Sequence, residues 1–268
     1  MKKLHLLGIC LLAIAASPIN SCRKVDEMKY LLENGRADLK QCTIDQMSQL
    51  LGSEPVSLNL TFAYNNRRDP VSIIVDLPTA PVYTQWLFYY DKKGRLSQSV
   101  TLHYDGTFER WHVYLYDDRD RIMVDSNYDR GQAGDRSTAL GKWQTTLYYD
   151  HLDRIIKEVS PYLNSIIDYT YNNQGNLTSI RRGNADVETL GGYVNEGNVL
   201  LTNHVWRFLA RNYSVNSRAH AYSLNDHGLA TDYTGMDGRD LGYFFFGGYN
   251  DINIYITYNC QDAPGIAK

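Results

Sequence analysis

Three aspartates near the end of the chain form the densest acidic group that could do chemistry there. Asp232, Asp237 and Asp240 lie in the stretch TDYTGMDGRD. Carboxylates grouped in this way can coordinate Ca²⁺ or supply the acid pair of a glycoside hydrolase. Gly235 and Gly238 separate them, and glycine in a polar stretch is typical of a plain turn. We therefore predict a turn without a metal, and keep the cation site and the catalytic pair as alternatives.

Other familiar catalytic and cofactor motifs are not found in the sequence. It contains no His-Glu-x-x-His segment, no Gly-x-Ser-x-Gly elbow, no phosphate-cradling glycine loop and no Cys-x-x-Cys pair. His103, His112 and His151 lack the spacing of metal ligands. The sequence therefore predicts no enzyme and no cofactor.

The N-terminal segment has the properties of a secretory leader. Lys2 and Lys3 precede an apolar run at 6–16, which is too short to span a bilayer as a helix. The leader ends in INSC at 19–22, which resembles the lipobox of bacterial lipoproteins, in which the cysteine is acylated. We expect the mature chain to be lipidated at Cys22 and tethered to the outer membrane without crossing it. An ordinary secretory signal with a chance cysteine is the alternative.

The leader also sets the expected organisation of the chain. We expect a signal peptide at 1–21, a tether at 22–41, a single β domain at 42–260 and a C-terminal tail at 261–268. Loss of the leader, which carries two lysines and no acids, takes the formal net charge from −3 to −5. This balance argues against a nucleic-acid partner. The expected partners are the membrane, through the lipid, and an envelope glycan or protein.

Two cysteines remain once the leader is removed and Cys22 carries lipid. Cys42 and Cys260 form an even pair in an oxidising compartment, so they are a disulfide candidate. The bond would join both ends of the domain and close a very long loop, worth about 5 kcal/mol in the chain-entropy model. Two independent buried thiols are the alternative.

Five tyrosine-led copies of one short pattern recur along the domain. The two best, YLYDDRDRI at 114–122 and LYYDHLDRI at 147–155, nearly repeat nine letters. The Tyr-Asx pairs stand at 64–65, 90–91, 116–117, 149–150 and 171–172, and a sixth copy at 224–229 lacks the tyrosine. Each pair is followed by a short polar turn and an aliphatic restart, as in hairpin units.

The geometry of a tight turn explains why the same residue types recur in each copy. In YDKKGRL at 90–96, Asp91 can accept backbone N–H bonds at the start of a type I turn, and Gly94 can take the left-handed conformation. Asp120 and Asp153 stand at the position of Gly94 in the two best copies, and aspartate is tolerated there. Arg68 stands there in the first copy and fits this conformation poorly.

The strands that enter the turns alternate in character. Counting back by twos from each repeat tyrosine gives one apolar, mostly aromatic face, which includes Phe88, Tyr114, Leu147 and Tyr169. The opposite face is mixed, and such alternation predicts an antiparallel meander packed on one side. Trp111 points to the opposite face, unlike Trp86 and Trp143. It is therefore the candidate ligand-binding residue, through stacking on a sugar ring.

Two segments interrupt the alternation. Residues 203–211 place apolar side chains at helical offsets, which predicts one short helix docked on the sheet. The segment TIDQ at 43–46 fits either a capping box or a strand and stays open. The segments 243–249 and 252–258 predict the final strands. A Cys42–Cys260 bond would lay the last strand beside the first and curl the sheet towards closure.

The segment YDKKGRL resembles the YD repeat of RHS-type surface proteins, and the other tyrosine-led copies are degenerate forms of it. With the lipobox, NHVWRFLARNYS at 203–214 and YNC at 258–260, the chain is similar to YD-repeat-like lipoproteins of Bacteroidota-type bacteria. The likeness covers most of residues 42–260. It implies an all-β, barrel-like or curled-sheet fold and no established activity. With the alternation and the helical segment, we predict an antiparallel meander of YD-type hairpins curling into a barrel-like or strongly curved sheet with one short helix. The likeness transfers no catalytic residues, and the repeats are too few to enclose a toxin.

Three hypotheses of function follow. The first is a non-catalytic, membrane-tethered envelope lipoprotein that binds a glycan or an envelope protein. The second is a purely structural or assembly lipoprotein without a soluble ligand. The third is a glycoside hydrolase using paired carboxylates, which requires two carboxyl groups about 5 to 9 Å apart in a cleft.

Overall fold

Fifteen strands and one α-helix make up the part of the chain described by this computed structural model, namely residues 39, 42–50, 57–76, 85–184, 186–218, 221–235 and 252–261. The helical elements are the 3₁₀ turns η2 (Arg136–Thr138) and η3 (Val199–Thr202) and the helix α2 (His204–Ala210). The strands are β1 (Cys42–Leu50), β2 (Ser57–Tyr64), β3 (Pro70–Asp76), β4 (Gln85–Tyr90), β5 (Leu96–Leu102), β6 (Thr107–Tyr116), β7 (Ile122–Gln132), β8 (Gly141–Tyr149), β9 (Ile155–Ser160), β10 (Ser165–Tyr171), β11 (Leu177–Arg182), β12 (Asp186–Thr189), β13 (Ala221–Leu224), β14 (Ala230–Gly235) and β15 (Ile252–Cys260).

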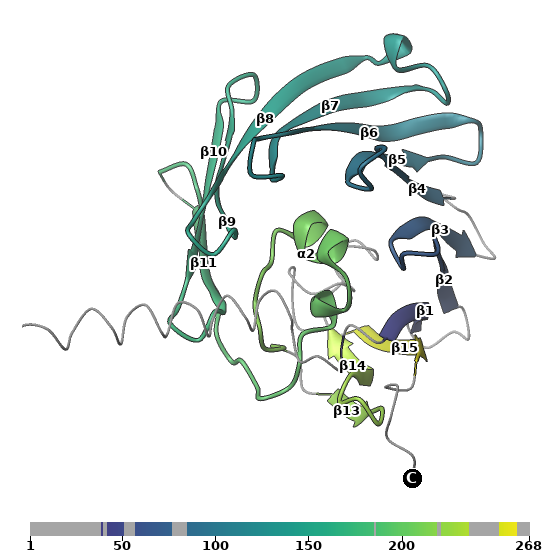
Figure 1. Cartoon of the computed structure of the whole chain (residues 1–268), viewed down its shortest axis with the longest axis vertical. Helices are drawn as coiled ribbons and strands as arrows, with labels where there is room; N and C mark the ends of the chain where they lie inside the picture. The colour runs from purple at the N-terminus through teal and green to yellow at the C-terminus, as the bar shows by residue number, and fades with distance from the viewer. Residues whose placement is uncertain are drawn as a thin grey trace, which may run out of the picture.

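All fifteen strands belong to one antiparallel sheet. Each strand from β1 to β12 pairs with its neighbours in sequence, and β15 pairs with the other side of β1 and carries β14 and β13. The sheet curves around α2 without closing, so β12 and β13 are its two edges among the described residues (Figure 1). The predicted meander and the placement of the last strand beside the first are confirmed, and residues 43–46 belong to β1. The segment 243–249, the leader and nearly all of the tether and tail lie outside the described residues.

The concave face holds the core. Phe88, Tyr114, Leu147 and Tyr169 are each at most 6% exposed, as the alternation predicts. Leu115 and Tyr148, on the opposite face, are about half exposed. A slip of one residue in any strand pairing would exchange these two sets, so burial of one face fixes the register of the sheet.

Helix α2 fills the space inside the curve (Figure 1). Its N-cap, Asn203, accepts a hydrogen bond from the Val205 backbone N–H at 2.9 Å and donates its amide to the Arg68 carbonyl at 3.0 Å. Trp206 is fully buried and meets the rings of Phe62 and Phe88 edge to face, with centroids 5.7 and 5.9 Å apart. The short helix is therefore held by tertiary packing rather than by its own length.

The six repeat turns share one set of backbone bonds. In the second copy the Asp91 N–H donates to the Arg95 carbonyl, the Gly94 N–H donates to the Asp91 carbonyl, and Asp91 Oδ1 accepts from the Arg95 N–H, all within 2.9 Å. The residue at the position of Gly94 has positive φ in every copy, which confirms the role given to Asp120 and Asp153. Arg68 also adopts it, at φ 65°. The side-chain amide of Asn203 donates a hydrogen bond to the Arg68 carbonyl, so a residue 135 positions away in the sequence helps to hold this turn.

Three of the repeat tyrosines also make the same hydrogen bond in their respective copies. Tyr90 donates its hydroxyl to the Pro70 carbonyl at 2.7 Å, and Tyr116 donates to the Leu96 carbonyl at 2.8 Å. In each case the acceptor lies five residues after the Asx of the preceding turn. The same relation holds for three further pairs: Tyr149 with Ile122, Tyr193 with Leu177, and Tyr258 with Ala230. Three of the five repeat tyrosines, Tyr90, Tyr116 and Tyr149, thus tie their own strand to the hairpin before it, whereas Tyr64 and Tyr171 make no such bond.

Arginines of the repeat connect neighbouring turns. Arg95 pairs with Asp91 at 2.7 Å, and its guanidinium lies 4.2 Å from the ring centroid of Tyr116 in the next copy. Arg121 and Arg154 repeat this arrangement over Tyr149 and Tyr171. Cation–π contacts of this kind contribute about 0.5–2 kcal/mol each, depending on burial.

Candidate binding site

An open cavity of about 740 Å³ lies where two loops meet at one end of the long β6–β7–β8 region. The β5–β6 loop is a tight turn in which the His103 N–H donates to the Thr107 carbonyl at 2.9 Å and Gly106 has a φ of 82°. The Ala133 N–H of the β7–β8 loop donates to the Gly106 carbonyl at 2.9 Å. We call this space the rim cavity; its lining includes His103, Tyr104, Phe108, Glu109, Arg130 and Leu140.

The polar side of the rim cavity is a linked set of charged groups. His103 Nε2 lies 3.1 Å from Glu109 Oε2, and Arg130 Nε lies 3.6 Å from the same oxygen. The His103 and Glu109 side chains are 20% and 23% exposed, so both are largely withdrawn from water but open to the cavity. Glu109 has no partner of its own in the pairing of β6 with β5, where the register shifts. Such a bulge redirects a side chain, as is common beside functional sites.

Aromatic side chains form the rest of this site. Phe108 is fully buried beneath the cavity, whereas Tyr104 is 74% exposed. The close fit around Phe108 needs glycine at position 131, because a Cβ there would lie 2.6 Å from the Phe108 ring and 2.8 Å from Thr138 Oγ1. The rim cavity therefore combines a packed floor, an exposed ring and hydrogen-bonding groups.

Trp111 lies behind this site and does not line it. Its Nε1 donates to Gln98 Oε1 at 2.8 Å, and its ring meets Phe108 edge to face at 5.7 Å. The Arg136 guanidinium of η2 stands 5.5 Å from the Trp111 ring centroid and 5.3 Å from that of Tyr128. The ring that the sequence proposes as a stacking surface thus already carries a cation, and its part in ligand binding stays a prediction.

A second group of charges lies on the concave face, next to the C-terminus of α2. Arg211, in the left-handed conformation that ends the helix, pairs with Asp125 at 3.2 Å and with Glu158 at 3.0 Å. His112 Nδ1 lies 2.8 Å from Asp125, and Tyr169 donates its hydroxyl to Glu158 at 2.6 Å. We call these five residues the interior network.

The electrostatics of the interior network favour an ionised Asp125. Burial on its own would raise the pKa of Asp125, which is 3% exposed, but the adjacent His112 and Arg211 hold that pKa below its usual value. Burial would likewise lower the pKa of Arg211, but Glu158 and Asp125 raise it. The group therefore acts as a charged clamp between the helix and strands β7 and β9.

A smaller cavity of about 300 Å³ lies between the repeat turns and α2, lined among others by Arg95, Arg121 and Arg207. Arg95 and Arg121 are each bound to an aspartate of their own turn, at 2.7 and 2.8 Å. Their charges are thus already compensated within the fold. This cavity also has less than half the volume of the rim cavity.

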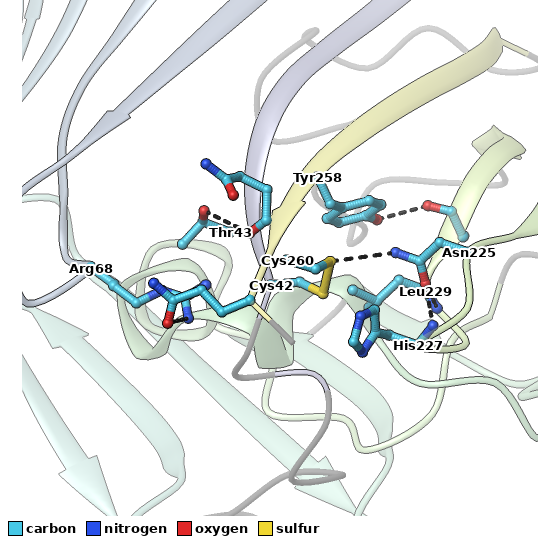
Figure 2. The surroundings of a disulfide bond; sticks show 11 residues. Cys42, Thr43, Arg68, Asn225, His227, Leu229, Tyr258 and Cys260 are labelled. Atoms are coloured by element: carbon cyan, nitrogen blue, oxygen red, sulfur yellow. Dashed lines mark hydrogen bonds between the residues drawn. A yellow bond between two sulfur atoms is a disulfide. The ribbon is translucent and has the colours of Figure 1, made fainter. Parts of the chain in front are cut away.

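The two cysteines paired by the sequence argument are bonded in the structure. Cys42 and Cys260 face each other across β1 and β15 and form a disulfide that spans 218 positions of sequence (Figure 2). The bond lies against a small apolar cluster that includes Leu39, Leu201 and Leu229. It therefore joins the first strand to the last, as expected.

The remaining sequence candidates are only partly placed. Asp232 lies on β14 opposite Ser223 and Tyr255, and its Oδ1 is buried without a hydrogen-bond partner. Asp237 and Asp240 lie outside the described residues, as does Cys22. Among the residues that the structure describes, no helix has the length and apolar character needed to cross a membrane.

Among the residues of the two polar sites, the sequence singles out only His103, His112 and Tyr169, and it assigns none of them to a site. Tyr104, Glu109 and Arg130 carry no motif, and only the Tyr-Asp-Gly of residues 104–106 marks a turn like the others. Arg211 meets Asp125 across 86 positions of sequence and Glu158 across 53. No local pattern encodes such pairings.

Fold and sites together define an all-β protein with an open meander sheet that curves around one short helix. No protein-family model matches the chain, and no curated protein sequence matches it. Among solved structures it is similar to a porin-like protein from Bacteroides uniformis, with 14% identity and a TM-score of 0.46 over 81% of this chain and 98% of that one. The neighbours also include a TcdB2–TccC3 structure, with 15% identity and a TM-score of 0.30 over 74% of this chain and 11% of that one.

A third neighbour is the Tc holotoxin pore of Photorhabdus luminescens, with 15% identity and a TM-score of 0.28 over 70% of this chain and 12% of that one. The chain thus spans about a tenth of the length of the toxin chains. At these identities and TM-scores, an account of function has to rest on the chain's own residues.

Proposed function

We propose that this protein is a non-catalytic binding module of the cell envelope, tethered by lipid at Cys22, and that it binds a glycan in the rim cavity. The observation that carries the proposal is the exposed ring of Tyr104 beside the half-buried His103–Glu109 pair in a space of about 740 Å³. Ligand pockets in proteins usually measure about 300–1,000 Å³.

The chemistry of the rim cavity matches a sugar. A pyranose offers hydroxyl groups that donate and accept hydrogen bonds, and a flat C–H face that packs on an aromatic ring. Glu109 can accept from hydroxyls, and His103 and Arg130 can donate to them. Tyr104 offers a rigid amphipathic ring with few rotatable bonds, so little entropy is lost on binding. Acidic and basic groups are mixed here, which favours a neutral ligand.

The tether and the family are part of the same proposal. The leader and its INSC ending support acylation at Cys22 and an outer-membrane location. The shared bonds of the six Asx turns support membership of a YD-repeat-like lipoprotein family. The repeat turn between β6 and β7 lies at the other end of these strands from the β5–β6 and β7–β8 loops, which are free to form a site.

A purely structural or assembly role is the second candidate, and the convex face favours it. Leu115, Val124, Thr146, Val159 and Ile166 are consecutive cross-strand partners from β6 to β10. Leu115 and Ile166 are 51% and 43% exposed. The three residues between them are half-buried, so the row offers a partly exposed, mostly apolar strip of the kind that contact surfaces use.

A glycoside hydrolase is less favoured by the interior network. A general acid of this class needs a raised pKa, so that it is protonated at the working pH. The pKa of Asp125 is instead held low, and Arg211 binds both acids of the network. We therefore treat the network as a structural clamp.

The test is retention of envelope glycan by immobilised mature protein. Fractionated glycans from a bacterial envelope extract are passed over the wild type, Tyr104→Ala and Tyr162→Ala, and the retained sugars are measured. Tyr162 is nearly as exposed as Tyr104, at 72%, but it lies in the β9–β10 turn and does not line the rim cavity, so it is a matched control. We expect retention by the wild type and the control, and loss in Tyr104→Ala. Retention of envelope proteins alone would favour the assembly role, and equal retention by all three would refute the rim cavity as the site.

A further inference from the structure

The disulfide has a histidine beside it. The sulfur atoms of Cys42 and Cys260 and a ring nitrogen of His227 all lie within 4.8 Å of one another. Figure 2 shows the imidazole next to the sulfur–sulfur bond. The three residues come from β1, from β15 and from the turn between β13 and β14, so the fold itself brings them together. Cys42 is fully buried, and the other two are half-buried.

The turn that carries His227 is rigid. Asn225 Oδ1 accepts hydrogen bonds from the His227 and Leu229 backbone N–H groups at 3.0 and 2.9 Å. The amide of Asn225 also points to Cys260 Sγ, at 3.8 Å. Tyr258, two residues before Cys260, donates its hydroxyl to the Ala230 carbonyl at 2.7 Å and so fastens β15 to the strand after the turn. These bonds hold the backbone at His227 beside β15 without help from the disulfide.

Two cysteines and one histidine are a frequent ligand set for zinc. Zn–S distances of about 2.3 Å and Zn–N distances of about 2.0 Å place the ligand atoms of a tetrahedral site roughly 3.5–3.8 Å apart. The ring nitrogen already lies within 4.8 Å of both sulfurs, so a shift of about 1 Å reaches this distance. The sulfurs need only separate from their bonded distance, and Cα atoms 3.9 Å apart allow this through side-chain rotation.

We propose that reduction of the Cys42–Cys260 disulfide converts this cluster into a zinc site formed by both thiolates and His227. A dithiol supplies two electrons and two protons, which break the sulfur–sulfur bond and leave two thiols while the dithiol becomes a disulfide. Binding of Zn²⁺ then releases the two thiol protons to solvent, and a water completes the tetrahedron. The disulfide and the metal exclude each other, because zinc binds cysteine as a thiolate and a sulfur in a disulfide is not a thiolate. The first and last strands stay joined in either state.

Cobalt titration of the mature protein tests this proposal. Co²⁺ replaces Zn²⁺ as a coloured probe, because thiolate ligation gives a near-ultraviolet charge-transfer band and tetrahedral geometry gives intense visible bands. The protein is used oxidised and after reduction with a phosphine, with circular dichroism recorded on each sample. We expect one Co²⁺ per chain with both bands in the reduced protein, displacement by Zn²⁺, and no bands in the oxidised protein.

Two variants separate the site from adventitious thiol binding. His227→Ala is expected to weaken Co²⁺ binding by at least about tenfold, the effect of disturbing even the groups that merely orient metal ligands. His151→Ala, in a turn of the same kind at 151 between β8 and β9, is expected to bind as the wild type does. Equal affinity of both variants would overturn the proposal. So would a reduced protein that binds no Co²⁺, or one that loses its β-sheet signal and does not regain it with the metal.

Discussion

Replacement of Arg211 by methionine is the sharpest test of how the sheet holds its helix. Arg211→Met keeps most of the volume of the side chain but removes its bonds to Asp125 at 3.2 Å and Glu158 at 3.0 Å. Asp125 is 3% exposed and would be left with His112 alone. Loss of one partner from a buried ion pair typically costs about 3–5 kcal/mol, because the other charge stays buried without compensation. We therefore expect the free energy of unfolding to fall by about 3–5 kcal/mol.

The pH dependence of the stability of Arg211→Met tests whether the uncompensated charge of Asp125 causes this loss. The pKa of Asp125 is lowered in the folded protein, so this group stabilises the fold above its unfolded pKa of about 4. That contribution is lost as the pH falls from about 4 through the lower, folded pKa. The stability gap between the wild type and Arg211→Met should therefore narrow below about pH 4.

The assay is urea unfolding of the mature protein, followed by tyrosine and tryptophan fluorescence at neutral and acidic pH. Arg119→Met is the control, because Arg119 pairs with Asp153 at 3.2 Å but its side chain is 58% exposed. Such surface pairs contribute about 0–1 kcal/mol. A loss in Arg211→Met no larger than in the control, or a gap that does not change with pH, would refute the reasoning.

Three further substitutions probe the repeat and the core. Tyr116→Phe removes the hydroxyl bonded to the Leu96 carbonyl at 2.8 Å and should cost about 1–2 kcal/mol in urea unfolding; an unchanged midpoint would show that this bond is not stabilising. Gly94→Ala places a side chain at a φ of 83° and should cost about 1 kcal/mol by the same measurement, whereas no loss would mean that the turn relaxes. Trp206→Ala empties a fully buried site and should lower stability by about 3–5 kcal/mol, and a loss below about 1 kcal/mol would contradict the docking of α2.

The fold could be predicted because its determinants are local. Phe88 and Tyr114 share a face by simple alternation, and Gly94 marks a left-handed turn position through its own conformational freedom. Arg68 shows the limit of this reasoning. Arginine disfavours a φ of 65°, but the bond from Asn203, 135 positions away, anchors the turn. A tertiary contact of this kind overrides a local preference.

The candidate sites could not be predicted in the same way. The cysteine count predicts the pairing of Cys42 with Cys260, but nothing in the sequence places His227 beside them. Glu109 and Arg130 face each other between the Phe108–Gly131 and Arg110–Asp129 pairs of β6 and β7, but the cavity beside them forms only where the β5–β6 and β7–β8 loops converge. The convergence depends on how far the strands extend beyond their neighbours, which the repeat spacing does not specify.

The most direct test of the central claim is hydrogen–deuterium exchange of the mature protein with and without the envelope glycan fraction that it retains. The account predicts slower exchange in the loops at 103–107 and 130–140, which line the rim cavity, and unchanged exchange in the repeat turns at 91–95 and 150–154. Protection confined to the repeat turns or to the convex face, with the two loops unaffected, would contradict it.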